Sequence, residues 1–176
     1  MNAAYWKRQQ VGDPHGPDKY AELQPESYPM LEAIEKVAPD HDASILDVGC
    51  NIGRHIKALR DHGYRQVWGI DVRSSTDHNV ITGTFEDLLP LMHKQWFDVV
   101  FTFGMTIELI PFHVPICHDL ARLAKHGVVL AVHEVHAPYC RKWKEEFEKE
   151  GFTCTRYQNP IVPDSQLSLF IFEKNP

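Results

Sequence analysis

The apolar residues of this chain follow two alternating patterns, one typical of buried strands and one typical of amphipathic helices. Continuous apolar runs predict five strands, at 44–49, 66–71, 79–82, 97–103 and 127–132. Apolar positions three or four residues apart predict helices at 26–39, 52–62, 85–93, 116–124 and 139–150. Strands that are apolar throughout and alternate with helices indicate a parallel sheet covered on both faces.

The predicted helices at 52–62 and 139–150 indicate which side chains they bury. In the first, we expect three residues to face inward: Ile52, Ile56 and Leu59. In the second, Trp143 and Phe147 lie four residues apart and should be buried, with lysine and glutamate side chains turned to solvent.

The C-terminal part of the chain changes this alternation. Residues 152–157 and 167–173 predict two strands in succession, joined by a proline-containing loop. Because no helix separates these strands, the last pair is free to be antiparallel.

The first 25 residues differ from the rest. A run of turn formers at 12–17 cannot hold a helix, and it lies between Tyr5-Trp6 and Tyr20. These aromatic residues are either a lid over a pocket or a strap packed on the core. We therefore expect an arm at 1–25, followed by a single domain at 26–176.

Composition and charge narrow the class of protein. The chain has 176 residues, of which 43% are hydrophobic and 24% charged, as in ordinary globular proteins. Its net charge of −6 argues against general nucleic-acid binding, which relies on a basic field. No apolar run approaches the roughly 20 residues that span a bilayer, so no membrane association is expected. The four cysteines form no CxxC pair, which predicts free thiols and a cytoplasmic location.

The segment from Ile45 to His55 is the most informative in the chain. An apolar strand runs into a glycine-bearing turn and directly on into a helix, which brings backbone N–H groups to the carboxyl edge of the sheet. Gly49 allows a tight turn, Asn51 tolerates a positive φ, and Gly53 permits close packing of helix on strand. A structural turn of an ordinary α/β domain is the alternative.

A carboxylate at the end of the next strand strengthens the ligand-binding interpretation. Asp71 follows Gly49 by 22 residues and is placed to accept hydrogen bonds from ribose hydroxyls. The chain lacks the GxGxxG of dinucleotide sites at this turn and a GK[ST] for a triphosphate. Acid, x, Gly, x, small, x, Gly and a second-strand acid form the pattern of S-adenosylmethionine sites.

These segments resemble the class I S-adenosylmethionine-dependent methyltransferases, especially the small methyltransferase-11/12-like group. The resemblance runs from about residue 44 to 134 and rests on the segments 46–54, 69–71, 83–88 and 97–104. The variants at 50–53 and 101–104 look like methylases of nucleotide-sugar and secondary-metabolite pathways. The resemblance implies a Rossmann-like, doubly wound α/β sheet, mostly parallel with an antiparallel C-terminal strand.

The resemblance also implies roles for individual residues. Asp47 and Gly49 would hold the methionine end of S-adenosylmethionine, Asp71 the ribose, and Thr84-Phe85 or Glu86 the adenine. The full implied cofactor set is Asp47, Gly49, Cys50, Asn51, Gly53, Asp71, Val72, Thr84, Phe85, Glu86, Phe103 and Gly104, the last two beneath the sulfonium.

The chain departs from the family pattern at two places. Thr84 stands where the family usually has an acid, which affects the adenine assignment. The stretch 72–78 is too short for the crossover helix between the second and third strands. We expect a loop there, with one face of the sheet thinly covered.

Methyl transfer is an in-line displacement, and the protein's main task is to align nucleophile and methyl group. A general base is needed when the acceptor must lose a proton, and histidine suits this task. The candidates at carboxyl ends of strands are Glu108, His133 and His136, with Glu134 beside them; each is otherwise a surface or capping residue. The two imidazoles would point to opposite sides of an extended chain, so no metal site is expected.

The sequence contains few motifs that indicate how the acceptor is recognised. No Asn/Asp-Pro-Pro-Tyr follows the fourth predicted strand, which counts against methylation of nucleic-acid bases. Without a separate substrate domain, recognition would come from the N-terminal arm and from the segments 108–114 and 136–139. The candidate substrate contacts are Tyr5, Trp6, Tyr20 and Tyr139. The sequence favours a methyltransferase of small molecules; the alternatives are a macromolecular acceptor with a partner protein, or an inactive S-adenosylmethionine-binding module.

Overall fold

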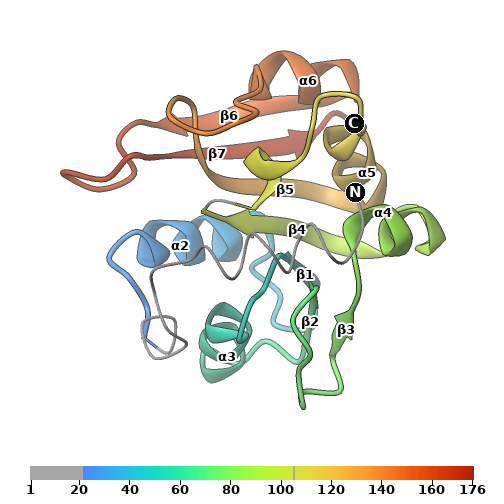
Figure 1. Cartoon of the computed structure of the whole chain (residues 1–176). Coiled ribbons are helices and arrows are strands. Elements are labelled where there is room, and N and C mark those ends of the chain that lie inside the picture. The colour runs from blue at the N-terminus through green and yellow to red at the C-terminus, as the bar shows by residue number, and fades with distance from the viewer. Residues whose placement is uncertain (1–21, 105) are drawn as a thin grey trace.

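A seven-stranded sheet forms the centre of the computed structural model, which describes residues 22–104 and 106–176 (Figure 1). The strand order is β3-β2-β1-β4-β5-β7-β6. The strands are β1 (Ser44–Val48), β2 (Gln66–Asp71), β3 (Val80–Thr82), β4 (Phe97–Phe103), β5 (Ala124–His133), β6 (Phe152–Gln158) and β7 (Leu167–Lys174). β7 is antiparallel to both of its neighbours, β5 and β6, whereas the pairs among β1 to β5 are parallel. The predicted fold class is confirmed.

Helices cover both faces of this sheet. They are α2 (Ser27–Val37), α3 (Arg54–Asp61), α4 (Phe85–Leu88), η2 (Leu89–Leu91), η3 (Ile107–Leu109), α5 (Ile116–Leu123) and α6 (Trp143–Lys149). Buried residues of α2 and α3 pack on one face, and those of α4, η2, α5 and α6 pack on the other. Successive residues of β1 enter opposite cores, because Ile45 belongs to the first cluster and Leu46 to the second.

The connection between β2 and β3 contains no helix, as the length of 72–78 predicts. Arg60 of α3 holds it, with Nη1 2.5 Å from Asp77 Oδ2 and Nη2 donating to the Val67 carbonyl oxygen at 3.1 Å. The hydrogen bond from Arg60 lowers the pKa of Asp77. Cover over this part of the sheet is thin: Trp68 is 37% exposed, and Val80 is only half-buried.

Two helices begin later than their apolar patterns predict. α3 begins at Arg54, because Asn51 and Gly53 have left-handed φ angles of 52° and 80°. Ile56 and Leu59 are buried as expected, but the prediction for Ile52 is wrong, since it precedes the helix and is 40% exposed.

α6 begins at Trp143 because the residues before it are engaged elsewhere. The Tyr139 amide donates to the Glu108 carbonyl oxygen at 3.0 Å, and Arg141 donates to carbonyl groups of the β4–α5 connection. Trp143 and Phe147 are buried as predicted. The helix carries its ion pairs three residues apart, at Lys142–Glu145 and Lys149–Glu146.

The edges of the sheet differ in length. β3 forms one edge with three residues, and β6 forms the other with seven. The pairing of β6 with β7 is irregular between Cys154 and Arg156. All four cysteines are free thiols. Among the described residues, no helix has the length and apolar character needed to cross a membrane.

Candidate functional site

The turn after β1 brings the chain to the carboxyl edge of the sheet. Gly49 has φ +83°, and its amide and that of Cys50 donate to the Ile70 carbonyl oxygen at 2.8 and 3.1 Å. A Cβ at Gly49 would lie 2.2 Å from Thr106 Cγ2. Both the backbone angle and the contact with Thr106 therefore require glycine here.

The rest of the turn agrees with the sequence analysis at Asn51 and differs at Gly53. Asn51 has the expected positive φ. The close packing predicted for Gly53 is wrong, because a Cβ there would lie an ordinary 3.7 Å from Ile56 Cδ1; Gly53 is required by its φ. The close approach occurs instead at Gly69 of β2, where a Cβ would lie 2.6 Å from Cys50 Sγ.

Asp71 ends β2 and contacts this turn. Its Oδ2 accepts a hydrogen bond from the Asn51 amide at 2.8 Å, and its Oδ1 accepts one from the Arg73 amide at 2.8 Å. A carboxylate has about four lone-pair sites, and at the carboxyl end of a strand it is a suitable acceptor for ligand hydroxyls. The structure thus brings the two acids of the sequence pattern, Asp47 and Asp71, to one end of neighbouring strands.

Asp47 is an unusual residue for this place, because it is a carboxyl group with 1% exposure inside β1. Burial and the nearby charge of Asp71 raise its pKa, and Arg54 only partly opposes them. Within the described part of the chain, Asp47 Oδ2 accepts no hydrogen bond. A buried carboxyl oxygen that has no hydrogen-bond donor from these residues favours binding of a cationic donor such as an ammonium group.

A buried histidine lies beside Asp47. His55 Nδ1 is 3.9 Å from Asp47 Oδ2, and His55 Nε2 is 3.0 Å from the hydroxyl of Ser27 in α2. Burial, with a smaller contribution from Arg54, lowers the pKa of His55 to about 3. His55 is therefore neutral at physiological pH. No local sequence signal identifies Ser27 or His55 as neighbours of the turn, since the contact joins two helices.

The residues predicted near the adenine have different environments. The Thr84 hydroxyl caps α4, donating to Asp87 Oδ2 at 2.7 Å and accepting from the Asp87 amide at 3.3 Å. Phe85 is buried in the core. Of the three predicted residues, only Glu86 has a half-buried side chain at this edge.

The end of β4 lies on the other side of the turn. The Phe103 ring packs against His55, with 4.8 Å between centroids, and the Arg54 guanidinium lies 5.3 Å from the Phe103 centroid. Gly104 has φ +72°, and no described heavy atom lies within 4 Å of where its Cβ would be. No described residue therefore fills the space beside Gly104 at the carboxyl edge.

The three candidate general bases separate into two groups. Glu108 and His133 are in contact: Glu108 Oε1 accepts from the His133 amide at 2.7 Å and lies 3.2 Å from His133 Nδ1. His136 is exposed, has φ +66°, and belongs to the loop after β5. Glu134 turns away, because its Oε2 accepts hydrogen bonds from Tyr157, Asn159 and Ser168.

A second contact ties the two loops predicted to recognise the acceptor. Arg141 Nη2 donates to three carbonyl oxygens of the β4–α5 connection, those of Ile110, Pro111 and Val114, at 3.1, 2.8 and 3.2 Å. Its guanidinium lies 5.3 Å from the centroid of Phe112, which is 62% exposed and packs edge-to-face on Tyr139. Sequence analysis identified Tyr139 but missed Arg141 and Phe112, whose roles depend on this long-range contact.

The remaining expectations concern the N-terminal arm and metals. Tyr5, Trp6 and Tyr20 lie outside the described residues, so their contacts stay predictions. In residues 22–104 and 106–176, no group of three or more His, Cys, Asp or Glu side chains is placed to hold a metal ion.

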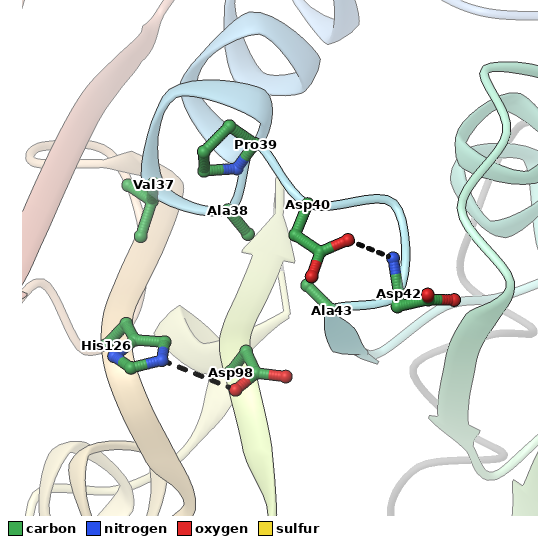
Figure 2. A pocket seen from close by; sticks show the side chains of 8 residues that line it. All are labelled: Val37, Ala38, Pro39, Asp40, Asp42, Ala43, Asp98 and His126. Carbon is green, nitrogen blue, oxygen red and sulfur yellow. Dashed lines mark hydrogen bonds and ion pairs between the residues drawn. The ribbon is translucent and has the colours of Figure 1, made fainter.

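A pocket of about 410 Å³ lies at the opposite, amino edge of the sheet (Figure 2). It is lined by Val37, Ala38, Pro39, Asp40, Asp42, Ala43, Asp98 and His126. Its central carboxylate, Asp98, is already bound to the Ser44 amide and hydroxyl and to Lys125. These hydrogen bonds lower the pKa of Asp98 despite its burial. The pocket is therefore separate from the carboxyl-edge site.

Several known proteins that resemble this chain are methyltransferases. Residues 46–132, just under half of the chain, match the family model of a methyltransferase domain. The search of curated proteins finds no match. Among solved structures, 1,6-didemethyltoxoflavin-N1-methyltransferase from Burkholderia thailandensis is 17% identical, with a TM-score of 0.74 over 99% of this chain and 89% of that one.

Two further solved structures have the same fold. Magnesium protoporphyrin IX methyltransferase from Synechocystis is 16% identical, with a TM-score of 0.67 over 98% of this chain and 91% of its own. A Haloferax volcanii protein in complex with the Trm112 methyltransferase activator is 15% identical, with a TM-score of 0.62 over 99% and 94%. The domain match and the shared fold support an S-adenosylmethionine-dependent methyltransferase, with S-adenosylmethionine as its cofactor.

Proposed function

We propose that this enzyme transfers the methyl group of S-adenosylmethionine to an oxygen or nitrogen atom of a small-molecule acceptor. The observation that carries the proposal is the carboxyl edge around the glycine turn. There, the buried Asp47 oxygen that accepts no hydrogen bond from the described residues lies beside Gly49, and Asp71 ends the adjacent strand. These groups match the ammonium and ribose of the cofactor.

Each part of the cofactor has a proposed partner. The α-ammonium of the methionine end donates to Asp47, with Gly49, Cys50, Asn51 and Gly53 supplying the backbone of the turn. The ribose hydroxyls donate to Asp71, and Val72 follows it beside the adenosine. Glu86, whose side chain is half-buried at this edge, is the proposed partner of the adenine amine, while Thr84 and Phe85 contribute backbone. Phe103 and Gly104 lie below the sulfonium, where open space remains.

The small-molecule acceptor is supported by two of the structural relatives. One is named for 1,6-didemethyltoxoflavin and another for magnesium protoporphyrin IX. The exposed Phe112 beside Tyr139 offers an aromatic surface on the β4–β5 side of the edge. The net charge of −6 is unfavourable for a polyanionic acceptor.

A macromolecular acceptor is the second candidate. It is favoured by the Haloferax relative, whose structure contains a methyltransferase activator, and it would require a partner protein. An inactive module that binds S-adenosylmethionine without transfer is the third possibility, because a fold can persist after its chemistry is lost.

Cofactor binding is tested by thermal unfolding and titration calorimetry. At a hundredfold excess over Kd, S-adenosylmethionine or its demethylated product should raise Tm by about 5–10 °C. Asp47→Asn should raise Kd by about 10- to 100-fold, because it removes a charge-assisted hydrogen bond to the ammonium. Asp61→Asn, an exposed carboxylate of α3, is the matched control. A shift with NAD and none with S-adenosylmethionine would contradict the proposal.

The acceptor is found by incubating the enzyme with methyl-labelled S-adenosylmethionine and cell extract fractionated by size. Label in small metabolites supports the proposed acceptor class. Label confined to protein or RNA favours the macromolecular candidate instead. Cofactor binding without label in any fraction identifies a binding module.

A further inference from the structure

Glu108 is a buried carboxylate whose two oxygens both accept hydrogen bonds from N–H groups. It lies in η3 and is fully buried. Oε1 accepts from the His133 amide at 2.7 Å, and Oε2 accepts from the Thr106 amide at 3.2 Å. Each oxygen of this buried side chain therefore has a backbone N–H donor, as a buried carboxylate requires.

This geometry determines which nitrogen of His133 carries its proton. Nδ1 lies 3.2 Å from Glu108 Oε1, an atom that can only accept, so Nδ1 is the protonated nitrogen of the neutral ring. Nε2 then holds a free lone pair. In the described part of the chain, Nε2 has no hydrogen-bond partner, and the His133 side chain keeps 16% exposure. An exposed acceptor nitrogen is what a general base requires.

Thr106 places this pair next to the proposed cofactor site. Its amide donates to Glu108, and its side chain lies directly over Gly49. His133 is also the last residue of β5, two residues after Ala131, which pairs with Phe103 at the end of β4. Thr106 is thus the single residue that connects the Glu108–His133 pair with Gly49. The pair also lies next to the end of β4, which is below the proposed sulfonium position.

The β4–α5 connection is tied to the loop after β5 without Glu108, through the Tyr139 amide and Arg141. Burying a carboxylate is costly unless its oxygens have donors, and the two backbone amides supply them. A glutamine could accept only one of these two bonds, because its amide nitrogen cannot accept. The carboxylate also faces the His133 ring, whose cation it would stabilise when the ring takes a proton.

We propose that Glu108 and His133 act as one unit in methyl transfer, with His133 Nε2 as the general base and Glu108 as the positioning residue that sets its tautomer. The inference rests on the proposed function and names the acceptor chemistry for the same site. His136, which is exposed on the following loop, has no part in this unit.

A lone pair of the acceptor oxygen or nitrogen attacks the methyl carbon, and the carbon–sulfur bond breaks as the new bond forms. The sulfonium becomes the neutral sulfide of S-adenosylhomocysteine. The proton of the acceptor O–H or N–H moves to His133 Nε2, and the imidazolium is stabilised by the Glu108 carboxylate until solvent takes the proton. The acceptor is therefore a proton-bearing nucleophile: an alcohol, a phenol or an N–H group.

The tautomer is tested by nitrogen NMR of the whole protein labelled with ¹⁵N-histidine. The His133 signals are those missing from His133→Asn. In the wild type they should show Nδ1 protonated and Nε2 bare, and in Glu108→Gln a mixture of tautomers should replace this state. An Nε2-protonated ring in the wild type would overturn the proposal.

The base role is tested with the extract fraction that accepts label. His133→Asn should lower turnover by about 100-fold or more, with an unchanged Tm shift on adding S-adenosylmethionine. His133→Gly should regain turnover when free imidazole is added, and Glu108→Gln should lose about 10-fold in kcat at constant cofactor Kd. The matched control is His126→Asn, an exposed histidine near the opposite end of the same strand, β5.

The outcomes separate this inference from the proposed function. Full turnover by His133→Asn, or a loss that imidazole does not restore, would refute the base while leaving the methyltransferase intact. If the wild type labels no fraction, both the proposed function and the role of His133 as general base are refuted. The NMR measurement in that case still decides whether Glu108 sets the tautomer of His133.

Discussion

The two halves of the carboxyl edge are built in different ways. On the β1–β2 side, the glycine turn is held to the neighbouring strand by backbone hydrogen bonds, those from the Gly49 and Cys50 amides to the Ile70 carbonyl oxygen. On the β4–β5 side, side chains join segments distant in sequence: Glu108 and His133 are 25 residues apart, and Arg141 and Ile110 are 31 apart. One half depends on chain geometry, and the other on the chemistry of particular side chains.

This difference matches what each half is proposed to bind: the cofactor on the β1–β2 side (the cofactor half) and the acceptor on the β4–β5 side (the acceptor half). A cofactor is the same molecule for every member of a class, so its site can use main-chain groups that tolerate sequence change. An acceptor differs from enzyme to enzyme, and loops on a rigid scaffold are where such specificity can vary. Thr106 connects the halves, because its amide binds Glu108 and its side chain contacts Gly49.

The largest expected effect comes from a substitution at this connection. Gly49→Ala places a Cβ where Thr106 lies and forces alanine into a left-handed φ. We expect a loss of about 2–4 kcal/mol in the free energy of unfolding and no cofactor-induced Tm shift. Urea unfolding and thermal melts measure both quantities.

The control for Gly49→Ala is Gly151→Ala, which has a similar φ of +82° but no described heavy atom within 4 Å of the new Cβ. Gly151→Ala should show only the backbone cost, about 1–2 kcal/mol. Adding Thr106→Ala to Gly49→Ala should recover part of the difference, because it removes Cγ2. Strict additivity of the two substitutions would show that the halves are not coupled through Thr106.

A somewhat smaller effect should be confined to the acceptor half. Arg141→Met removes the donor to three carbonyl oxygens while keeping a long apolar stem. We expect a destabilisation of about 2–3 kcal/mol and an unchanged cofactor Kd, since no contact of Arg141 reaches the glycine turn. Calorimetric titration with S-adenosylmethionine gives Kd, and Arg65→Met, an exposed arginine, is the control. A large change in Kd would mean that the halves are not separable.

The smallest effect concerns pH and the cofactor half. His55 has a folded pKa of about 3 against 6.5 unfolded, so folding favours its neutral form. Its stabilising contribution is therefore present above pH 6.5 and is lost as pH falls from 6.5 toward 3. When the pH is lowered from 7 to 5, the low pKa of folded His55 should decrease the free energy of unfolding by about 2 kcal/mol. His55→Gln should remove this part of the pH dependence in urea unfolding; an unchanged slope would assign it to other groups.

The parts of this molecule that depend on local rules were predicted from sequence. The seven strands, the antiparallel C-terminal pair and the helix-free link after β2 follow from apolar runs and segment lengths. The positive φ of Asn51 follows from the turn chemistry of that residue. These features need no knowledge of what lies across the sheet.

The errors arose where a distant contact decides the local structure. The apolar spacing of Ile52 predicted burial, but the left-handed turn delays the start of α3. The pattern at 139–142 predicted helix, but Arg141 is engaged with the β4–α5 connection. Glu108 and His133 were identified singly, as residues after strands. Their pairing depends on the course of two loops, which periodicity does not describe.

The two edges of the sheet bear on how the enzyme avoids polymerising with itself. An exposed edge strand offers unpaired N–H and C=O groups on which another molecule can add a strand. β3 offers a template of only three residues, too short for a stable added strand. β6 is longer, but its pairing irregularity between Cys154 and Arg156 twists that edge, and exposed Thr153 and Thr155 border it with polar groups. The short β3 thus limits strand addition at the end of the sheet where the β2–β3 connection has no helix.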